Sequence, residues 1–190
     1  MKHTVKLTIV TLLVFSLASC KKEKTHAEEN PLEKYYELTG FNTKTIAQNA
    51  GWYESSLAFS PLVKGKINAL TIKIPDVNSA LKVTIWDYDT KAALRTETIE
   101  VAAANTQVVK SITPLSLEKD KKYIISMNSN DWYIMKKPDG SDATYPLTAG
   151  NIKFIEYRWV DAVSGTPKFP TIISHNYNAG DLSFVFQQTE

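Results

Sequence analysis

His175 is the residue of this sequence best suited to acid–base chemistry. Beyond the apolar leader the chain has two histidines, and the other, His26, lies in a highly charged segment. A triad can be written from Ser174, His175 and Asp181, since a base held by a carboxylate activates a nearby hydroxyl. The chain has no GxSxG, HExxH or CxxC motif and no glycine-rich phosphate loop. We therefore predict that the protein is not an enzyme. A hydrolase of unknown type that uses His175 remains an alternative.

Two carboxylates stand close together at the end of one predicted strand. Asp87 and Asp89, with Asn128, Asn130 and Asp131 elsewhere, offer the hard oxygen ligands that calcium prefers. Their spacing matches no defined calcium loop. The other interpretation is that both form turns, because an aspartate side chain accepts hydrogen bonds from its own backbone. A structural calcium at Asp87 and Asp89 is thus an expectation, and we predict no other cofactor.

Aromatic residues at predicted strand ends and in loops form the third candidate set. Aromatic faces stack on the apolar side of a sugar ring, while nearby polar groups bond its hydroxyls. This chemistry favours a glycan as the ligand. The alternative is that Trp86 packs under a loop and that the tyrosines fix loops to the domain. The candidate ligand-binding residues are Trp86, Trp132, Tyr133, Tyr145, His175 and Tyr177.

The single cysteine, Cys20, follows an apolar run after a short basic start. The run, residues 7–18, is too short to span a bilayer but suits a secretory signal peptide. The tetrad from Leu17 to Cys20 resembles the lipobox of bacterial lipoproteins. The resemblance implies cleavage before Cys20, acylation of that residue and attachment to the membrane by the lipid. Lys21 follows Cys20 where an aspartate favours inner-membrane retention, so the cell envelope, at the outer membrane, is the expected location.

Charge excludes a dedicated nucleic-acid surface. Residues 1–19 contain Lys2 and Lys6 and no acidic residue, so their removal lowers the 22 basic residues to 20, equal to the 20 acidic ones. A nucleic-acid-binding domain would show a basic excess. The predicted partners are the membrane, through the lipid, and a glycan or an envelope protein.

Alternating apolar residues predict strands with one buried face. The pattern appears at five places, separated by turn signals rich in Pro, Asn, Asp and Gly, and no stretch supplies the long helices that a parallel α/β fold needs. We therefore predict an all-β, antiparallel sandwich or jelly-roll-like domain. Two long loops, residues 138–150 and 161–180, flank one strand and are expected to open near one end of the sandwich. The alternating sets are Leu70/Ile72/Ile74, Leu81/Val83/Ile85, Tyr123/Ile125/Met127, Ile155/Tyr157/Trp159 and Leu182/Phe184/Phe186.

The segment before the strands is predicted to link the lipid to the domain. Residues 20–30 contain no Val, Leu, Ile, Met, Phe, Tyr or Trp and carry both charge signs, which indicates a solvated tether. Residues 31–41 predict either one short helix between Pro31 and Gly40 or a stalk whose Tyr35 and Tyr36 dock on the domain. The expected organisation is a signal peptide over 1–19, a lipidated cysteine and tether or stalk over 20–44, and a β-sandwich over 45–190.

Residues 50–135 are similar to an uncharacterised bacterial family, the domain of unknown function four-zero-eight-two. The glycine expected after Asp87 is absent, and residues 136–190 extend past the likeness. The resemblance implies a β-sandwich module of secreted or surface proteins, often in carbohydrate-related contexts, and it supplies no catalytic residues. The matching positions are Phe59, Gly65, Leu70, Trp86, Asp87, Leu94, Tyr123, Trp132 and Tyr133.

Together these patterns predict a cell-envelope lipoprotein whose β-sandwich is a non-catalytic binding or accessory module, with a glycan as the expected ligand. A structural subunit of an envelope complex is the first alternative, and the hydrolase is the second.

Overall fold

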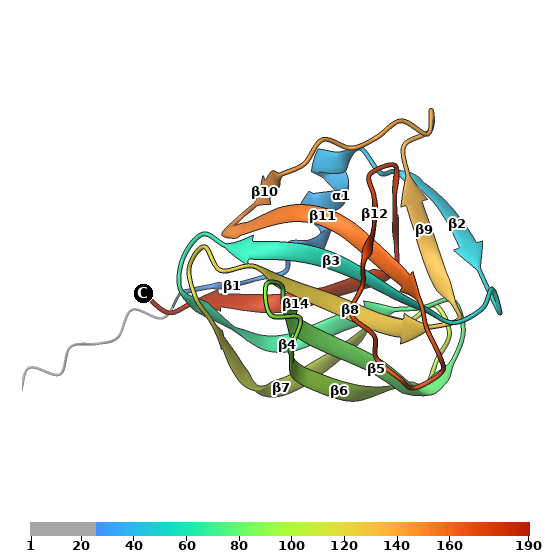
Figure 1. Cartoon of the computed structure of the whole chain (residues 1–190), viewed down its shortest axis with the longest axis horizontal. Coiled ribbons are helices and arrows are strands. Elements are labelled where there is room, and N and C mark those ends of the chain that lie inside the picture. Colours follow the sequence, from blue (N-terminus) through green and yellow to red (C-terminus); the bar gives the residue numbers. More distant parts are fainter. Residues whose placement is uncertain (1–25) are drawn as a thin grey trace, which may run out of the picture.

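The fold is an antiparallel β-sandwich, which confirms the predicted fold class. The computed structural model describes residues 26–190, which form fourteen strands and one short helix (Figure 1). Among these residues no helix is long and apolar enough to cross a membrane. Cys20 and the leader lie outside the described residues, so lipidation of Cys20 stays a prediction.

Three antiparallel sheets make up the body. The four-stranded sheet has the order β1 (Glu28–Glu29), β14 (Asp181–Gln188), β4 (Gly65–Lys73) and β7 (Val108–Leu117). The seven-stranded sheet has the order β10 (Leu147–Ala149), β11 (Ile152–Asp161), β3 (Tyr53–Pro61), β8 (Tyr123–Ser129), β5 (Asn78–Asp87) and β6 (Ala93–Val101), and β12 (Ile172–Ser174) also pairs with β11. The three-stranded sheet has the order β13 (Tyr177–Ala179), β9 (Trp132–Lys136) and β2 (Thr43–Ala47).

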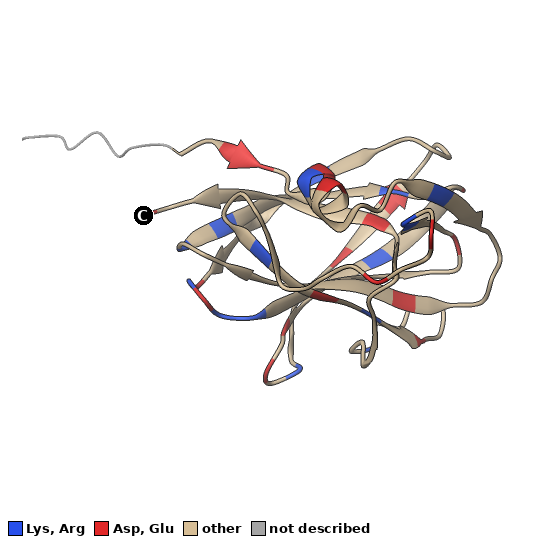
Figure 2. Cartoon of the chain, turned by 90° about the horizontal axis from the view of Figure 1, so that it is seen from above, with Lys and Arg blue, Asp and Glu red and all other residues tan. Residues whose placement is uncertain are grey.

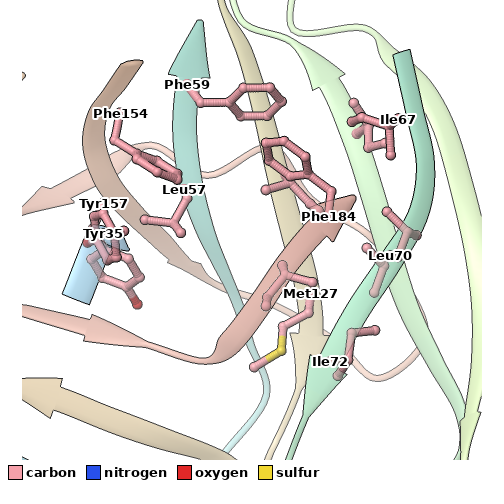
Figure 3. Packing of buried hydrophobic residues seen from close by; sticks show 14 of the residues in the cluster. Tyr35, Leu57, Phe59, Ile67, Leu70, Ile72, Met127, Phe154, Tyr157 and Phe184 are labelled. Carbon is pink, nitrogen blue, oxygen red and sulfur yellow. The ribbon is translucent and has the colours of Figure 1, made fainter. Parts of the chain in front are cut away.

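The main core fills the space between the two larger sheets. Successive strand residues point to opposite faces, so the alternating apolar sets of β4, β5, β8 and β14 send their side chains into this space. Figure 3 shows Phe59 from β3 beside Phe184 from β14, and their ring centroids are 4.5 Å apart. Met127 and Ile72 lie in the same layer and are fully buried. The sets in β4, β5, β8 and β14 are all buried, as predicted.

The alternation in β11 is interrupted, which the sequence pattern did not predict. A β-bulge shifts the register between Phe154 and Glu156. A bulge adds one residue to one strand and changes which face the following residues take. Phe154 and Tyr157 therefore both reach the main core, whereas Ile155 packs on the outer face of the sheet with Trp86.

The folded body begins earlier than the predicted boundary at residue 45. β1 pairs with β14, and α1 (Leu32–Thr39) lies between Pro31 and a left-handed Gly40, which confirms the helix interpretation. Tyr35 is completely buried, 4.8 Å from Phe154 between ring centroids. The expectation of a tether or stalk through residue 44 therefore differs from the structure, because α1 carries large apolar side chains that close one part of the core.

Charged residues are spread over the body. Figure 2 shows basic and acidic positions interspersed along the strands and loops, with no separation into a basic and an acidic half. This distribution agrees with the balanced charge of the chain after residue 19.

Candidate functional site

A pocket of about 570 Å³ lies between the three-stranded sheet and the ends of β3 and β11. This volume falls in the range of small-molecule sites, which are mostly apolar with a few polar groups that fix orientation. Alanines, Ile134 and Gly140 complete the walls. Its aromatic and polar lining residues are Tyr53, Ser55, Trp132, Lys136, Tyr157, Trp159, Asn176 and Tyr177.

The period-two geometry of the strands explains why these side chains meet. Tyr53 and Ser55 are two residues apart on β3, and so are Tyr157 and Trp159 on the neighbouring β11. Residues at this spacing share one face of a sheet. On the facing wall Trp132, Ile134 and Lys136 alternate along β9 in the same way. The pocket is therefore formed by two sheet faces rather than by loops alone.

The aromatic rings of the pocket hold one another in place. Tyr53 lies edge-on between two tryptophans, with its centroid 5.2 Å from that of Trp132 and 5.8 Å from that of Trp159. The Trp159 indole donates a hydrogen bond of 3.2 Å to Ser174. Tyr177 packs on Tyr157 at 5.2 Å between centroids. Such contacts fix the ring planes, which gives a ligand preorganised stacking surfaces.

The electrostatics of the pocket come from one cation. Lys136 is the only charged residue among those that line it, and the lining contains no carboxylate, histidine or cysteine. Burial raises the pKa of Tyr157 well above its ordinary value, so this hydroxyl stays neutral. In the described residues no group of three or more His, Cys, Asp or Glu could hold a metal ion. The pocket can thus stack, donate and accept hydrogen bonds, and attract an anion.

Two of the predicted binding residues, Trp132 and Tyr177, line the pocket, and four do not. Tyr133 points to the opposite face of β9, where Lys44 Nζ lies 3.4 Å from its ring centroid and its hydroxyl donates to Asn105. Tyr145 shares a 2.6 Å hydrogen bond with Tyr35, and the His175 ring packs on Tyr145. The packing interpretation therefore fits Tyr133, Tyr145 and His175.

Trp86 also lies away from the pocket, on the outer face of the seven-stranded sheet. Its ring meets Phe169 edge-on at 5.8 Å, and Phe169 belongs to the 162–171 loop, the connection between β11 and β12. Its indole donates a 2.8 Å hydrogen bond to Ser126. Trp86 is thus covered by a loop, as the packing alternative predicted.

A buried carboxyl group lies under the same loop. Glu54 is 0% exposed and accepts hydrogen bonds from Ser126 at 2.5 Å and from Asn128 at 3.3 Å. Asn128 in turn accepts a 2.8 Å hydrogen bond from the backbone N–H of Gly165 in the 162–171 loop. Burial raises the pKa of Glu54 to about 7, although hydrogen bonds to Ser126, Asn128 and the Lys168 backbone act to lower it.

Asp87, one of the two predicted calcium ligands, is bound to other groups of the protein. Asp87 accepts hydrogen bonds from the backbone N–H groups of Asp89 and Thr90, at 3.0 and 2.9 Å, and pairs with Lys121 at 2.8 Å. Lys121 and the Thr90 backbone lower the pKa of Asp87 to about 2. These contacts favour the turn-forming interpretation for Asp87, whereas Asp89 takes part in the turn through its backbone N–H.

The three residues of the possible Ser–His–Asp triad each contact a different aromatic residue. Ser174 accepts its hydrogen bond from Trp159, His175 packs on Tyr145, and Asp181 accepts a 2.8 Å hydrogen bond from Tyr36. The contacts of the described residues therefore do not assemble a nucleophile–base pair at this place.

Sequence reasoning missed Tyr53, Trp159 and Lys136. The alternating pattern places Trp159 on a buried strand face, and no motif marks Tyr53 or Lys136 as a site residue. One signal was present, because Trp159 stands at the end of its strand beside a long loop. No sequence pattern indicated that β9 would face β3 and β11.

No family model matches this chain, and no curated protein matches it either. The resemblance of residues 50–135 to the domain of unknown function four-zero-eight-two therefore stays a prediction.

Proposed function

We propose that this protein is a bacterial cell-envelope lipoprotein whose β-sandwich is a non-catalytic module that binds glycans. The observation that carries the proposal is the pocket, where the half-buried Trp159 and Tyr177 offer ring surfaces beside Ser55 and Asn176. The buried Trp132 forms part of the pocket wall. Sugar rings stack on such surfaces and exchange hydrogen bonds with such polar groups.

The lining supports binding rather than hydrolysis. Glycosidases in most families use a pair of carboxyl groups that flank the scissile bond. No Asp or Glu is among the residues that line the pocket. The hydrolase alternative, with His175 as acid or base, gains no support from the contacts of His175.

The position of the pocket suits an anchored binding protein. β1 and the C-terminus lie together at one end of Figure 1, while β2 and β9, which form one wall of the pocket, lie at the other. A lipid on Cys20 would hold the β1 end near the membrane, since the chain from Cys20 to Glu28 spans at most roughly 28 Å. The pocket would then lie at the end of the domain that is farther from the bilayer.

Removal of the two predicted pocket aromatics is expected to weaken glycan binding at least about tenfold, since each stacked ring contributes on the order of 1 kcal/mol. The variant is Trp132→Ala with Tyr177→Ala, measured on a glycan array and by affinity electrophoresis. The control is Tyr88→Ala, which removes a ring from the outer face of the seven-stranded sheet and is expected to leave binding unchanged. An array on which the native protein binds nothing, or equal binding by the double variant, would refute the proposal.

A structural role in an envelope complex is the second candidate, and one observation favours it. Ile172 and Ile173 on the edge strand β12 are 41% and 46% exposed. The backbone of an unpaired strand edge can form hydrogen bonds with another chain, and exposed apolar side chains beside it can contact that chain. A stable, stoichiometric partner recovered from solubilised membranes, and lost with Ile173→Lys, would favour this role over glycan binding.

A further inference from the structure

Lys136 lies in the pocket without a carboxylate to balance it. It is the only charged residue of the lining, its side chain is exposed, and it forms no salt bridge within residues 26–190. Its two cross-strand neighbours, Thr43 on β2 and Tyr177 on β13, are both uncharged. Lysines in sheets are commonly stabilised by an opposite charge across the strands, so this arrangement leaves the ammonium group available to a ligand.

Other charges near this place are already engaged. Lys44 on β2 pairs with Asp181 at 3.4 Å and lies over the Tyr133 ring on the far side of the three-stranded sheet. Lys137 donates to the carbonyl of Asp142. Asp139 accepts hydrogen bonds from the Ser141 backbone and hydroxyl at 3.0 and 2.8 Å. Its carboxylate is therefore bound within its own loop. Among the described residues that line the pocket, Lys136 is therefore the charged group that a bound ligand would meet.

The pairing of Lys136 with Tyr177 places a cation beside a stacking surface. Residues directly opposite in an antiparallel pair have Cβ atoms about 5 Å apart. A pyranose that stacks on Tyr177 would thus bring a carboxylate on its ring next to the Lys136 ammonium, while Asn176 can bond its hydroxyls. We propose, on the premise that the pocket binds glycans, that it selects acidic sugars, with Lys136 recognising the carboxylate of a uronic acid.

The test compares acidic glycans with their neutral counterparts. An array carries uronic-acid oligosaccharides beside the same oligosaccharides after reduction of their carboxyl groups. The native full-length protein is expected to bind the acidic form about fivefold more tightly, the upper range for a solvent-exposed ion pair. This preference is expected to shrink as NaCl rises, because salt screens exposed charges.

Variants at Lys136 separate charge from shape. Lys136→Gln is expected to bind the acidic and the reduced oligosaccharides with equal affinity, the affinity that the native protein has for the reduced form. Lys136→Arg is expected to retain the preference for the acidic form. The control is Lys110→Gln, an exposed lysine on β7 in the other layer of the sandwich. Binding confined to neutral glycans, or a preference that Lys136→Gln leaves unchanged, would overturn the acidic-sugar inference while glycan binding stands. Binding to no glycan at all would overturn the proposed function, and the inference with it.

Discussion

The free energy of unfolding is expected to fall by about 3 kcal/mol as the pH rises from below 4.5 to above 7, through Glu54 alone. The pKa of Glu54 is raised from 4.5 to about 7 in the folded protein, mainly by burial. Between these values the folded state binds a proton that the unfolded state has lost. Stability therefore decreases with rising pH, at about 1.36 kcal/mol for each unit of difference in pKa.

The contacts of Glu54 show how the protonated form is accommodated. Ser126 donates to Glu54 in the charged state, and its hydroxyl also lies 3.4 Å from the Thr84 carbonyl. When Glu54 carries a proton, it can donate to Ser126, and Ser126 can donate to Thr84 instead. A glutamine can reproduce the same pattern, because its amide donates to Ser126 and its carbonyl accepts from Asn128.

Glu54→Gln is therefore expected to remove most of this pH dependence. The measurement is urea unfolding at a series of pH values from 4 to 8, with the native protein and the variant compared at each pH. Other groups titrate in both proteins, so the difference between the two curves isolates Glu54. Glu100→Gln, an exposed carboxyl group on β6, is the matched control and is expected to follow the native curve. Parallel curves for Glu54→Gln and the native protein would contradict the expectation.

Tyr35→Ala is expected to lower the free energy of unfolding by about 3 to 5 kcal/mol, the usual cost of removing a large buried aromatic ring. Tyr35 is completely buried, and its hydroxyl is 2.6 Å from that of Tyr145. The substitution leaves a cavity between α1 and Phe154 and deprives Tyr145 of its partner. The measurement is the midpoint of urea unfolding.

Two further variants make this result specific. Tyr35→Phe keeps the ring and is expected to cost about 1 kcal/mol, the net value of one hydrogen bond. Lys34→Ala changes an exposed neighbour on the same helix, whose ion pair with Glu37 is at the surface, and is expected to cost less than about 0.5 kcal/mol. If Tyr35→Ala costs no more than Lys34→Ala, residues 32–39 do not belong to the cooperative fold.

The sequence by itself determined the fold class and most of the strand faces. Leu70 and Ile72 are two residues apart, as are Phe184 and Phe186, which is the spacing expected for a strand with one buried face. All four residues are buried. Pro31 and Gly40 set the ends of α1 because proline suits a helix start and glycine a left-handed helix end. These features depend on interactions between residues close in the chain, so they can be read without the tertiary structure.

Only the tertiary structure decided which aromatic residues form a pocket. Trp86 and Trp132 both stand at strand ends beside turns, but their surroundings differ. Trp86 is covered by Phe169, whereas Trp132 packs on Tyr53 and lines the pocket. Alternation fixes the face of a strand on which a side chain lies. It does not fix what covers that face, because this depends on pairings such as β9 with β2 and β13, which join segments distant in the chain. For the same reason the bulge at Phe154 and the burial of Glu54 under the 162–171 loop were invisible in the pattern of residues alone.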